Sequence, residues 1–175
     1  MFLNKIKLFL LISICLIFFF LTYNDVKSEE LKNLSGIANV TDGDSLKINK
    51  KKIRLFGIDA PENKQQCQKI WLTISFVSFK KKYPCGEIST KKLKSKIDGK
   101  IIKCQIKGKD LYKRYLSECF LGKTNINAWM VKNGYAVSYR KYSKKFIVYE
   151  NLAKNEKLGL WSGTFDMPWE WRKKN

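Results

Sequence analysis

Residues 46–62 of the chain read L-K-I-N-K-K-K-I-R-L-F-G-I-D-A-P-E. Apolar residues alternate or run together in 46–48 and 53–58, and the polar residues 49–52 separate the two groups. This pattern is typical of two strands joined by a turn. The stretch therefore predicts a β-hairpin whose second strand leads directly into the acidic segment that begins at Asp59.

The remaining sequence divides into a strand-rich first half and a helix-rich second half. We find no internal repeat and no linker rich in Pro, Gly or Ser after residue 28, which indicates one domain at 29–175. The fold class that accommodates the expected elements most simply is α+β, a five-stranded β-barrel with packed helices, which resembles the OB-fold of many nucleic-acid-binding proteins. Apolar spacing and helix-ending glycines predict further strands at 100–107 and 115–121, a short extended piece at 135–139, and helices at 85–97, 126–133 and 146–157.

The composition limits the chemistry that the chain can perform. Its 175 residues include no histidine, which excludes triads that use histidine, histidine general bases and histidine metal ligands. Carboxylates, Lys, Arg, Tyr or a hard metal ion must therefore carry any catalysis. Because 45% of the residues are hydrophobic and 14% are aromatic, the chain can bury a core although 29% of it is charged.

Residues 1–28 have the organisation of a secretory signal peptide. Two lysines precede an apolar run of 14 residues, 8–21, and a small residue, Ser28, stands before the expected cleavage site. The apolar run is shorter than the roughly 20 residues of a membrane span, and an uncleaved N-terminal anchor is the alternative. We therefore expect a secreted or periplasmic domain at 29–175. Removal of three lysines and one aspartate lowers the net charge from +20 to +18.

Four cysteines lie in the expected mature chain. In an oxidising compartment an even number of cysteines indicates disulfides rather than a metal site or a catalytic thiol. Three pairings are possible, and sequence position favours Cys67–Cys85 and Cys104–Cys119, because the second pair lies on two expected neighbouring strands. Four unpaired thiols are the alternative.

Basic residues predict the class of partner. The chain has 35 lysines and arginines against 15 acidic residues. A single lysine run such as 50–52 is most simply a solvated face, but the whole excess creates a field that attracts nucleic acid, anionic polysaccharide or a lipid surface. The charge therefore predicts a polyanionic partner without identifying the function. The only arginines are Arg54, Arg114, Arg140 and Arg172.

Candidate catalytic residues concentrate in two neighbouring segments. Residues 40–45, V-T-D-G-D-S, place two carboxylates around a glycine, and the end of the predicted hairpin adds an arginine, an aspartate and a glutamate. If the segments pair as strands, Asp44 and Asp59 can converge on one hard cation, while Arg54 and Glu62 face the same pocket. A cation beside a carboxylate base and an arginine is an arrangement that cleaves phosphodiesters. Each motif alone is more simply explained as a turn or a helix start.

Five ordered motifs resemble the staphylococcal nuclease (thermonuclease) family. They span nearly all of the expected mature chain, in the order and at spacings typical of that family. The ending P-W-E-W-R at 168–172 and the two cysteine pairs further resemble exported bacterial members. The five motifs are D-G-D-S at 42–45, R-L-F-G-I-D-A-P-E at 54–62, D-L-Y-K-R at 110–114, N-A-W-M-V-K-N-G-Y-A at 127–136 and G-L-W-S-G at 159–163.

The resemblance implies an OB-fold nuclease that hydrolyses phosphodiesters of DNA or RNA with Ca²⁺ and leaves 3′-phosphate ends. On the family pattern, Asp44 and Asp59 ligate the metal through their carboxylates, and Ala60 ligates it through its backbone carbonyl. The family more often has threonine at the position of Ala60, a change that a backbone ligand tolerates. The resemblance thus predicts one Ca²⁺ site built from residues of the first two motifs.

The same resemblance implies the catalytic roles. Glu62 is the general base that orients or deprotonates the attacking water. Arg54 and Arg114 bind the phosphate through two prongs and stabilise the charge of the transition state, for which lysine is a poorer substitute. The family usually has glycine where this chain has Lys113. We expect nucleic acid as the substrate and a monomer without a stable protein partner.

Two alternatives remain open on the sequence. A non-catalytic cationic OB-fold module that binds nucleic acid or anionic polysaccharide at the cell envelope is the alternative to a nuclease. Residues 68–84, which include Trp71, Phe76 and Phe79 beside lysines 80–82, have two interpretations. They form either a surface on which unpaired bases stack or, as we favour, a small hydrophobic cluster beneath a loop.

Overall fold

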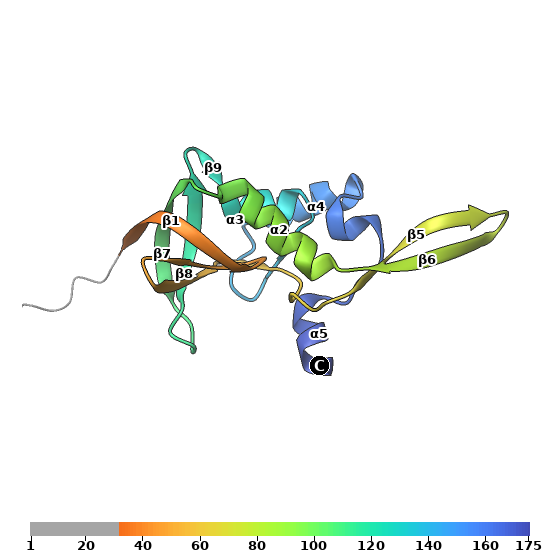
Figure 1. The fold of residues 1–175 in the computed structure, drawn as a ribbon, viewed down its shortest axis with the longest axis horizontal. Helices are drawn as coiled ribbons and strands as arrows, with labels where there is room; N and C mark the ends of the chain where they lie inside the picture. Colours follow the sequence, from red (N-terminus) through yellow and green to blue (C-terminus); the bar gives the residue numbers. More distant parts are fainter. Residues whose placement is uncertain (1–31) are drawn as a thin grey trace, which may run out of the picture. The chain divides into compact units, whose positions relative to one another are not determined.

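A closed β-barrel with packed helices forms the centre of the protein, in a computed structural model whose described residues are 32–175 (Figure 1). The predicted signal peptide or anchor, residues 1–28, lies outside the described residues. Within the described part, no helix is both long enough and apolar enough to cross a membrane. The strands are β1 (Asn33–Asp42), β2 (Ser45–Ile48), β3 (Lys51–Leu55), β4 (Ile58–Asp59), β5 (Cys67–Ile74), β6 (Val77–Tyr83), β7 (Ile101–Lys109), β8 (Tyr115–Leu121), β9 (Thr124–Asn125) and β10 (Val137–Ser138). The helices are α2 (Cys85–Ile97), α3 (Ile126–Lys132), α4 (Ile147–Asn155) and α5 (Pro168–Lys174), with a 3₁₀ turn at Gly159–Ser162.

The barrel closes through one parallel strand pair. β1 pairs antiparallel with β2 and β7, β2 pairs with β3, and β7 pairs with β8. β3 then pairs in parallel with β8, where Ile53 lies opposite Tyr115, so the strand order β1-β2-β3-β8-β7 returns to β1. This architecture confirms the predicted α+β fold, an OB-fold-like barrel of five strands with packed helices.

The predicted β-hairpin is the β2–β3 pair. Its turn consists of Asn49 and Lys50 alone, because Ile48 already pairs with Lys51, so the turn is shorter than predicted. Both turn residues have positive φ angles, 48° and 66°, as a tight two-residue hairpin turn requires. Ile48 on β2 and Ile53 on β3 are fully buried and fill the barrel.

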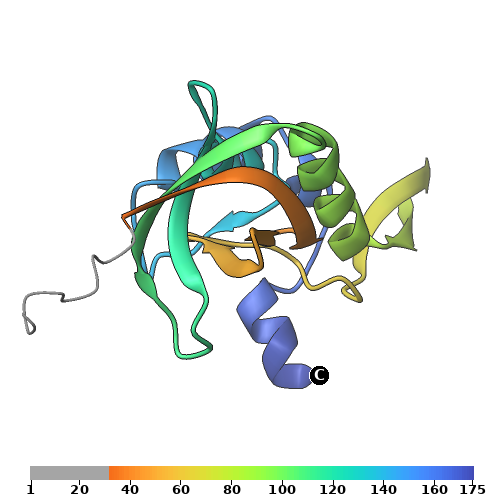
Figure 2. The ribbon, with the colours of Figure 1, turned by 60° about the vertical axis from the view of Figure 1, so that its left-hand side comes forward.

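The helices form close to where the sequence predicts them. α2 has the predicted bounds and lies along the barrel beside β1 (Figure 2), whereas α3 and α4 end one and two residues earlier than predicted. The side chain of Asn125 accepts a hydrogen bond from the first turn of α3 and so caps that helix. The buried side chain of Asn127 bonds to the amide of Cys119 and to the carbonyls of Phe56 and Ser117. Asn127 thereby fixes α3 against β8 and against the connection that leads from β3 to β4.

Both predicted disulfides are present. Cys104 and Cys119 join directly opposite positions of β7 and β8. Cys67 and Cys85 join the start of β5 to the start of α2. The alternative of four free thiols therefore does not hold.

Residues 68–84 do not form a loop over a hydrophobic cluster, so the favoured interpretation of this segment was wrong. β5 and β6 pair with each other as an antiparallel hairpin that extends away from the barrel and the helices (Figure 1). Trp71, Phe76 and Phe79 on this hairpin are exposed. Tyr83, at its base, packs against a buried cluster beside the first disulfide. A two-stranded sheet without a covering layer leaves its apolar side chains in solvent, which the composition of the segment could not reveal.

Two elements that position the site were not predicted. β1 has a weak apolar alternation, N-L-S-G-I-A-N-V-T-D, so its sequence alone does not mark it as a strand. α5 begins at Pro168, a favoured first residue of a helix. Met167 and Trp169 pack against the buried cluster that contains the first disulfide. Figure 2 places α5 beside the barrel, close to the segment that links β4 to β5.

Candidate active site

Arg54 joins the two aspartates that the motifs contain. Its Nη1 donates to Asp44 Oδ1 at 2.8 Å, and its Nη2 donates to Asp59 Oδ1 at 2.5 Å. The barrel sets this geometry, because Arg54 pairs across β2 and β3 with Ser45, the neighbour of Asp44, and Asp59 follows on β4. Both carboxylates are buried. The structure therefore brings Asp44, Arg54 and Asp59 together.

Two buried carboxyl groups, those of Asp44 and Asp59, share one guanidinium. Burial raises the pKa of Asp44 to about 8, although the positive charge of Arg54 opposes that rise. Burial alone would lower the pKa of Arg54, but Asp44 and Asp59 outweigh it and hold that pKa above its usual value. A second positive charge is therefore favourable beside these carboxylates.

Arg172, on α5, supplies a second positive charge. Its Nη2 donates to Asp59 Oδ2 at 2.7 Å, and its Nη1 donates to Asp59 Oδ1 at 3.2 Å and to Glu62 Oε1 at 2.7 Å. Burial alone would lower the pKa of Arg172, but its bonds to the two carboxylates raise it well above the usual value. No sequence pattern assigned Arg172 to the site. The one sequence feature that could have indicated it is that Arg172 is one of four arginines in a chain whose other basic residues are all lysines.

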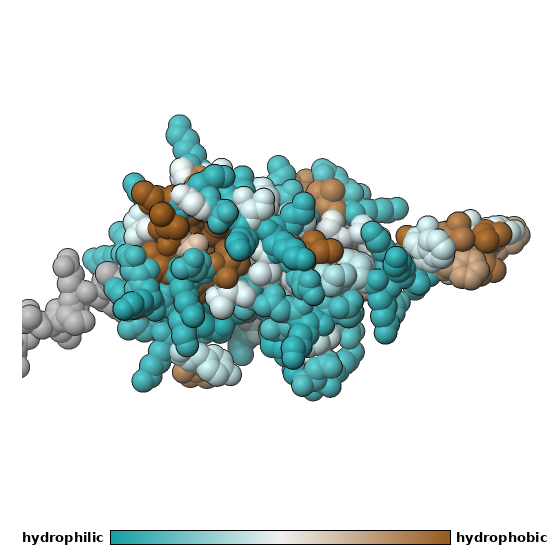
Figure 3. Space-filling model, viewed as in Figure 1, coloured by the Kyte–Doolittle hydropathy of each residue, from teal (hydrophilic) through white to brown (hydrophobic). Residues whose placement is uncertain are grey.

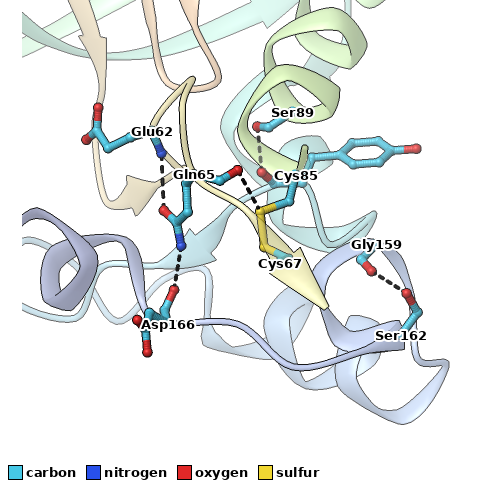
Figure 4. The surroundings of a disulfide bond; sticks show 9 residues. Glu62, Gln65, Cys67, Cys85, Ser89, Gly159, Ser162 and Asp166 are labelled. Carbon is cyan, nitrogen blue, oxygen red and sulfur yellow. Dashed lines mark hydrogen bonds between the residues drawn. A yellow bond between two sulfur atoms is a disulfide. The ribbon is translucent and has the colours of Figure 1, made fainter. Parts of the chain in front are cut away.

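Glu62 stands at the edge of the site, with 35% of its side chain exposed. The loop that carries it is held by Gln65, a buried residue. Gln65 Oε1 accepts a hydrogen bond from the Glu62 amide at 3.3 Å, and Gln65 Nε2 donates to the Asp166 carbonyl at 2.8 Å (Figure 4). The Sγ atom of Cys85 lies 3.4 Å from the Gln65 carbonyl oxygen. The first disulfide and the segment before α5 thus both support the position of Glu62.

Two glycines allow α2 to approach the backbone of the site. A Cβ atom at Gly43 would lie 2.1 Å from Ser89 Oγ and 2.7 Å from Ala60 Cβ. A Cβ atom at Gly86 would lie 1.7 Å from the carbonyl oxygen of Glu62. Close approach of this kind requires glycine. The glycine of the D-G-D motif therefore serves packing against α2 in addition to forming a turn.

Arg114 reaches the site from the loop between β7 and β8. Asp110 accepts hydrogen bonds from the Arg114 Nε at 2.7 Å and from the Arg114 amide at 2.9 Å. Burial alone would raise the pKa of Asp110, but these bonds outweigh it and lower that pKa. Lys113 has a φ of 60°, a left-handed conformation that favours glycine, which explains why the resembled family usually has glycine there. The loop nevertheless holds Arg114 in place through Asp110.

An open cleft of about 440 Å³ collects these side chains. Four of its six lining residues are cationic and one is a carboxylate, a combination that can bind a phosphate and leave one proton acceptor beside it. The predicted residues Arg54, Glu62 and Arg114 therefore share this cleft, and Asp44 and Asp59 are joined to it through Arg54. The lining residues are Lys52, Arg54, Glu62, Tyr112, Arg114 and Arg172.

The donor groups at Asp44 and Asp59 suit a hard cation, because such ions prefer carboxylate, carbonyl and water oxygens. Among residues 32–175, no group of three or more Asp, Glu or Cys side chains is placed to hold a metal ion, so a cation here would need backbone or water oxygens as well. The amide of Ala60 donates to Asp44 Oδ2 at 3.0 Å, which puts the Ala60 backbone at the site; ligation through its carbonyl stays a prediction. Both oxygens of Asp59 accept hydrogen bonds from arginines. A cation that binds Asp59 therefore competes with Arg172 for the carboxylate oxygens.

Comparison with known proteins finds relatives over most of the described residues. Residues 52–163 match a family model described as staphylococcal nuclease homologue. A Haemophilus influenzae protein named as an uncharacterized endonuclease is 34% identical over 150 residues, which cover 81% of this chain and 74% of that protein. An Escherichia coli protein of the same name is 31% identical over 78% of this chain and 82% of its own length. A rice protein, probable staphylococcal-like nuclease CAN3, is 32% identical over 74% of this chain, but the match spans only 30% of the rice protein.

Proposed function

Since the chain belongs to the staphylococcal nuclease family, we propose that it is an exported nuclease that hydrolyses phosphodiester bonds of DNA or RNA with Ca²⁺ and leaves 3′-phosphate ends. The observation that carries this proposal is the cleft in which Glu62 stands beside Arg54 and Arg114. The bonds of Arg54 to Asp44 and Asp59 connect that cleft to a pair of buried carboxylates. Substrate binding, proton acceptance and cation binding thus have separate residues in one place.

Arginines hold the substrate in this proposal. A planar guanidinium presents two parallel N–H groups to two phosphate oxygens, which fixes the phosphate in one orientation. Arg54 and Arg114 line the cleft with these groups, and Lys52 adds a further positive charge. As negative charge builds on the phosphate oxygens during attack, the same donors stabilise it. Binding should weaken steeply with salt, because phosphate contacts release counterions.

Glu62 accepts the proton in this proposal. Its partly exposed carboxylate at the cleft edge is open to a water molecule. The water oxygen bonds to phosphorus as its proton passes to the carboxylate, and the bond from phosphorus to the 5′ oxygen on the opposite side breaks. That oxygen takes up a proton from solvent. The hydrogen bond from Arg172 to Glu62 Oε1 orients the carboxylate but also occupies one of its two oxygens. Glu62 is therefore most effective as a base when Arg172 has moved away from it.

Ca²⁺ bound at the buried carboxylates would supply Lewis-acid stabilisation of the phosphate charge. Asp44 and Asp59 would hold it through side-chain oxygens, with the Ala60 carbonyl as a third ligand. Arg54, bonded to both aspartates, keeps their carboxylates in place. This division of roles explains why the motif needs two aspartates and an arginine together.

A non-catalytic module that binds nucleic acid or anionic polysaccharide is the second candidate. The observation that favours it is Arg172, which pairs with both Asp59 and Glu62 and so engages two residues that catalysis requires. In a binding module this pairing would be permanent, and the positive charges of the cleft would remain available to a polyanion. In a nuclease, the bonds of Arg172 to Asp59 and Glu62 must break before catalysis.

Incubation of the full chain with labelled single-stranded DNA and RNA, in Ca²⁺ or in excess chelator, separates the two candidates. We expect cleavage in Ca²⁺ only, with products that a 3′-phosphatase shifts on a sequencing gel. Cleavage that persists in chelator would contradict the metal assignment. Tight, salt-sensitive binding without any cleavage would favour the binding module.

Export and the monomeric state are tested on protein recovered from the producing cell. We propose that the mature chain begins at or near Glu29, which intact-mass measurement of material from the medium or periplasm would establish. An unprocessed chain that pellets with membranes would favour the anchor. Light scattering of the same material should give the mass of one chain, whereas a multiple of it would contradict the proposed monomer.

A further inference from the structure

The β5–β6 hairpin carries an exposed apolar tip that the proposed nuclease activity does not use. We define the hairpin tip as residues 70–79, I-W-L-T-I-S-F-V-S-F, of which seven are apolar and none is charged. Phe76, at the turn, is completely exposed, and Trp71 is 61% exposed. Figure 3 shows hydrophobic side chains gathered at the outer part of the hairpin. Contiguous exposed apolar surface of this kind marks a site that another molecule covers.

Lysines surround the base of the hairpin tip. Lys69 precedes the tip, and Lys80, Lys81 and Lys82 follow it; we call these four residues the lysine collar. Lys69 lies opposite Lys81 in the strand pairing, so these two side chains share one face of the hairpin. Lys80 and Lys82 lie on the other face, because successive strand residues point to opposite sides. Positive charge therefore lies on both faces of the hairpin, where the apolar tip begins.

We propose that this hairpin docks the protein on an anionic lipid surface. The hairpin tip enters the interfacial layer, and the lysine collar contacts the negatively charged headgroups. An apolar end followed by a ring of lysines matches the order of acyl chains and charged headgroups in a bilayer leaflet. Trp71 lies next to the collar, at the level where tryptophan prefers the membrane interface.

The backbone of the hairpin limits how deeply it enters. β5 and β6 form a sheet of two strands, so the outer edges of the tip carry peptide groups that the ladder does not pair. Such groups stay out of the hydrocarbon core, because nothing there can accept or donate a hydrogen bond. Thr73 and Ser78 share a hydroxyl hydrogen bond of 3.2 Å on one face, whereas Leu72 and Phe79 lie opposite each other on the alternate face. The hairpin tip is thus suited to enter the interfacial layer no deeper than the headgroup boundary.

The distribution of side chains argues against single-stranded nucleic acid as the occupant. Stacking surfaces for unpaired bases interleave aromatic rings with cations along a groove. In the hairpin tip four of the seven apolar residues are aliphatic and offer no ring, and the charges are confined to the collar. Segregation of apolar and cationic residues along the hairpin axis fits a lipid surface better than a polynucleotide. The aliphatic residues are Ile70, Leu72, Ile74 and Val77.

The base of the hairpin is firmly attached to the rest of the domain. The disulfide Cys67–Cys85 closes it. Gln68 exchanges two backbone hydrogen bonds with Thr164, at 2.9 and 2.8 Å. A membrane contact at the tip would therefore hold the barrel close to the lipid surface rather than swing on a free linker.

Quenching of Trp71 fluorescence by brominated lipid tests the proposal in the full chain. Because the apolar residues 8–21 could bind vesicles by themselves, the readout is the part of the quenching that disappears in Trp71→Phe, not total binding. We expect this Trp71-dependent quenching in vesicles of brominated phosphatidylcholine with phosphatidylserine, and at least tenfold less of it without phosphatidylserine. Phe76→Asp should reduce it at least tenfold. The matched control Val148→Asp, at another exposed apolar position on α4, should leave it unchanged.

Charge variants test the lysine collar in the same assay. Lys80→Glu combined with Lys81→Glu should reduce the Trp71-dependent quenching in anionic vesicles. The matched control, Lys47→Glu combined with Lys123→Glu, makes the same change of charge at exposed positions outside the hairpin and should leave the quenching unchanged. Absence of Trp71-dependent quenching at every lipid composition, or equal quenching in the parent and Phe76→Asp, overturns the proposal. Loss of single-stranded DNA affinity in Phe76→Asp with unchanged vesicle contact would assign the tip to nucleic acid instead. A concentration-dependent dimer that Phe76→Asp dissolves would assign it to a second copy.

Discussion

Arg172 and Asp59 are 113 positions apart in the chain, yet they share two hydrogen bonds, of 2.7 and 3.2 Å. Asp59 is fully buried and also accepts a hydrogen bond from Arg54. Two guanidinium groups therefore neutralise the Asp59 carboxylate. The C-terminal helix is therefore a structural part of the candidate active site. Any cation that binds Asp59 competes with the side chain of Arg172.

Arg172→Gln should lower the free energy of unfolding in chelator and also lower the Ca²⁺ concentration that gives half-maximal cleavage. Loss of hydrogen bonds between charged groups costs about 1.5–3 kcal/mol, and removal of the competing guanidinium leaves Asp59 available to the metal. Denaturant unfolding measures the first effect, and a Ca²⁺ titration of the cleavage rate measures the second. Lys174→Gln removes an exposed ion pair from the same helix and should change neither. A raised Ca²⁺ requirement would mean that Arg172 assists metal binding.

Glu62→Gln should reduce the Ca²⁺-dependent cleavage rate by about 10²–10⁴-fold, the range typical of a lost general base. Affinity for DNA should stay the same or rise, because the change removes one negative charge from a cationic cleft. Single-turnover kinetics and binding titrations on the same variant measure both. Glu156→Gln, at an exposed position, serves as the matched control. Unchanged cleavage by Glu62→Gln would remove this residue from the mechanism.

Gly86→Ala sets two effects against each other. Alanine is favoured over glycine inside a helix by about 1 kcal/mol, but the added Cβ would lie 1.7 Å from the Glu62 carbonyl oxygen. Overpacking of this kind costs about 1–3 kcal/mol, so we expect a net loss of stability and a slower cleavage rate because Glu62 is displaced. Thermal unfolding and kcat measure the two effects, with the exposed neighbour Glu87→Ala as control. A variant that is both more stable and fully active would show that the loop carrying Glu62 shifts without loss of stability or activity.

Glu150 supports Asp59 indirectly and makes stability depend on pH. It is buried, and it accepts hydrogen bonds from the Ser138 amide at 2.9 Å, Arg140 at 3.0 Å and Lys154 at 2.6 Å. Burial alone would raise the pKa of Glu150, but these bonds outweigh it and lower that pKa. Ser138 belongs to β10, the partner of the strand that carries Asp59.

Glu150→Gln should therefore destabilise the protein most at neutral pH. A group whose pKa is lower in the folded state contributes stability above its unfolded pKa, and this contribution disappears as pH falls through the folded value. The difference in unfolding free energy between parent and variant should shrink accordingly on acidification. Urea unfolding at a series of pH values measures it. A difference that stays constant would mean that the ionised form of Glu150 is not what stabilises the fold.

The two disulfides should affect activity differently. Each closes a loop of similar length, 18 and 15 residues, so loss of either by paired Cys→Ser substitution should lower stability by about 3 kcal/mol. Loss of Cys67–Cys85 should also slow cleavage, because this bridge supports the loop of Glu62, whereas loss of Cys104–Cys119 should not. Unfolding curves and kcat at a temperature where both variants are folded measure these effects. Equal activity in the two variants would contradict the supporting role of the first bridge.

Sequence patterns predicted the residues of the site that lie on neighbouring barrel strands. Arg54 and Ser45 pair in a hairpin with a clear apolar alternation, so the convergence of Asp44, Arg54 and Asp59 follows from local pattern and register. The position of Arg172 does not, because it depends on how α5 docks. That docking rests on side chains such as Trp169, whose ring lies 5.5 Å from that of Tyr139. Contacts of this kind arise from tertiary packing, which the spacing of apolar residues along a single element does not predict.

The hairpin tip is a case in which the apolar composition of a segment predicts burial but the structure leaves the segment exposed. A run of Ile, Trp, Leu, Phe and Val normally predicts burial, because burial of apolar surface drives folding. In residues 70–79 the side chains have only the facing strand as a neighbour and remain exposed. Composition alone does not distinguish a segment that packs within the chain from one that is available to another surface.

Closure of the barrel by β3 and β8 makes its folding depend on an encounter between distant parts of the chain. Ile53 and Tyr115 are about 60 residues apart, and parallel pairing over such a separation is slow, on the order of milliseconds to seconds. The Cys67–Cys85 bridge shortens the intervening loop by at most 18 residues. This lowers the entropic cost of closing the loop by only about 0.3 kcal/mol. Until β8 arrives, the strand that carries Arg54 is held on one side only. The rate at which the active site assembles should therefore depend on synthesis and docking of β8, and hardly at all on whether the first disulfide has already formed.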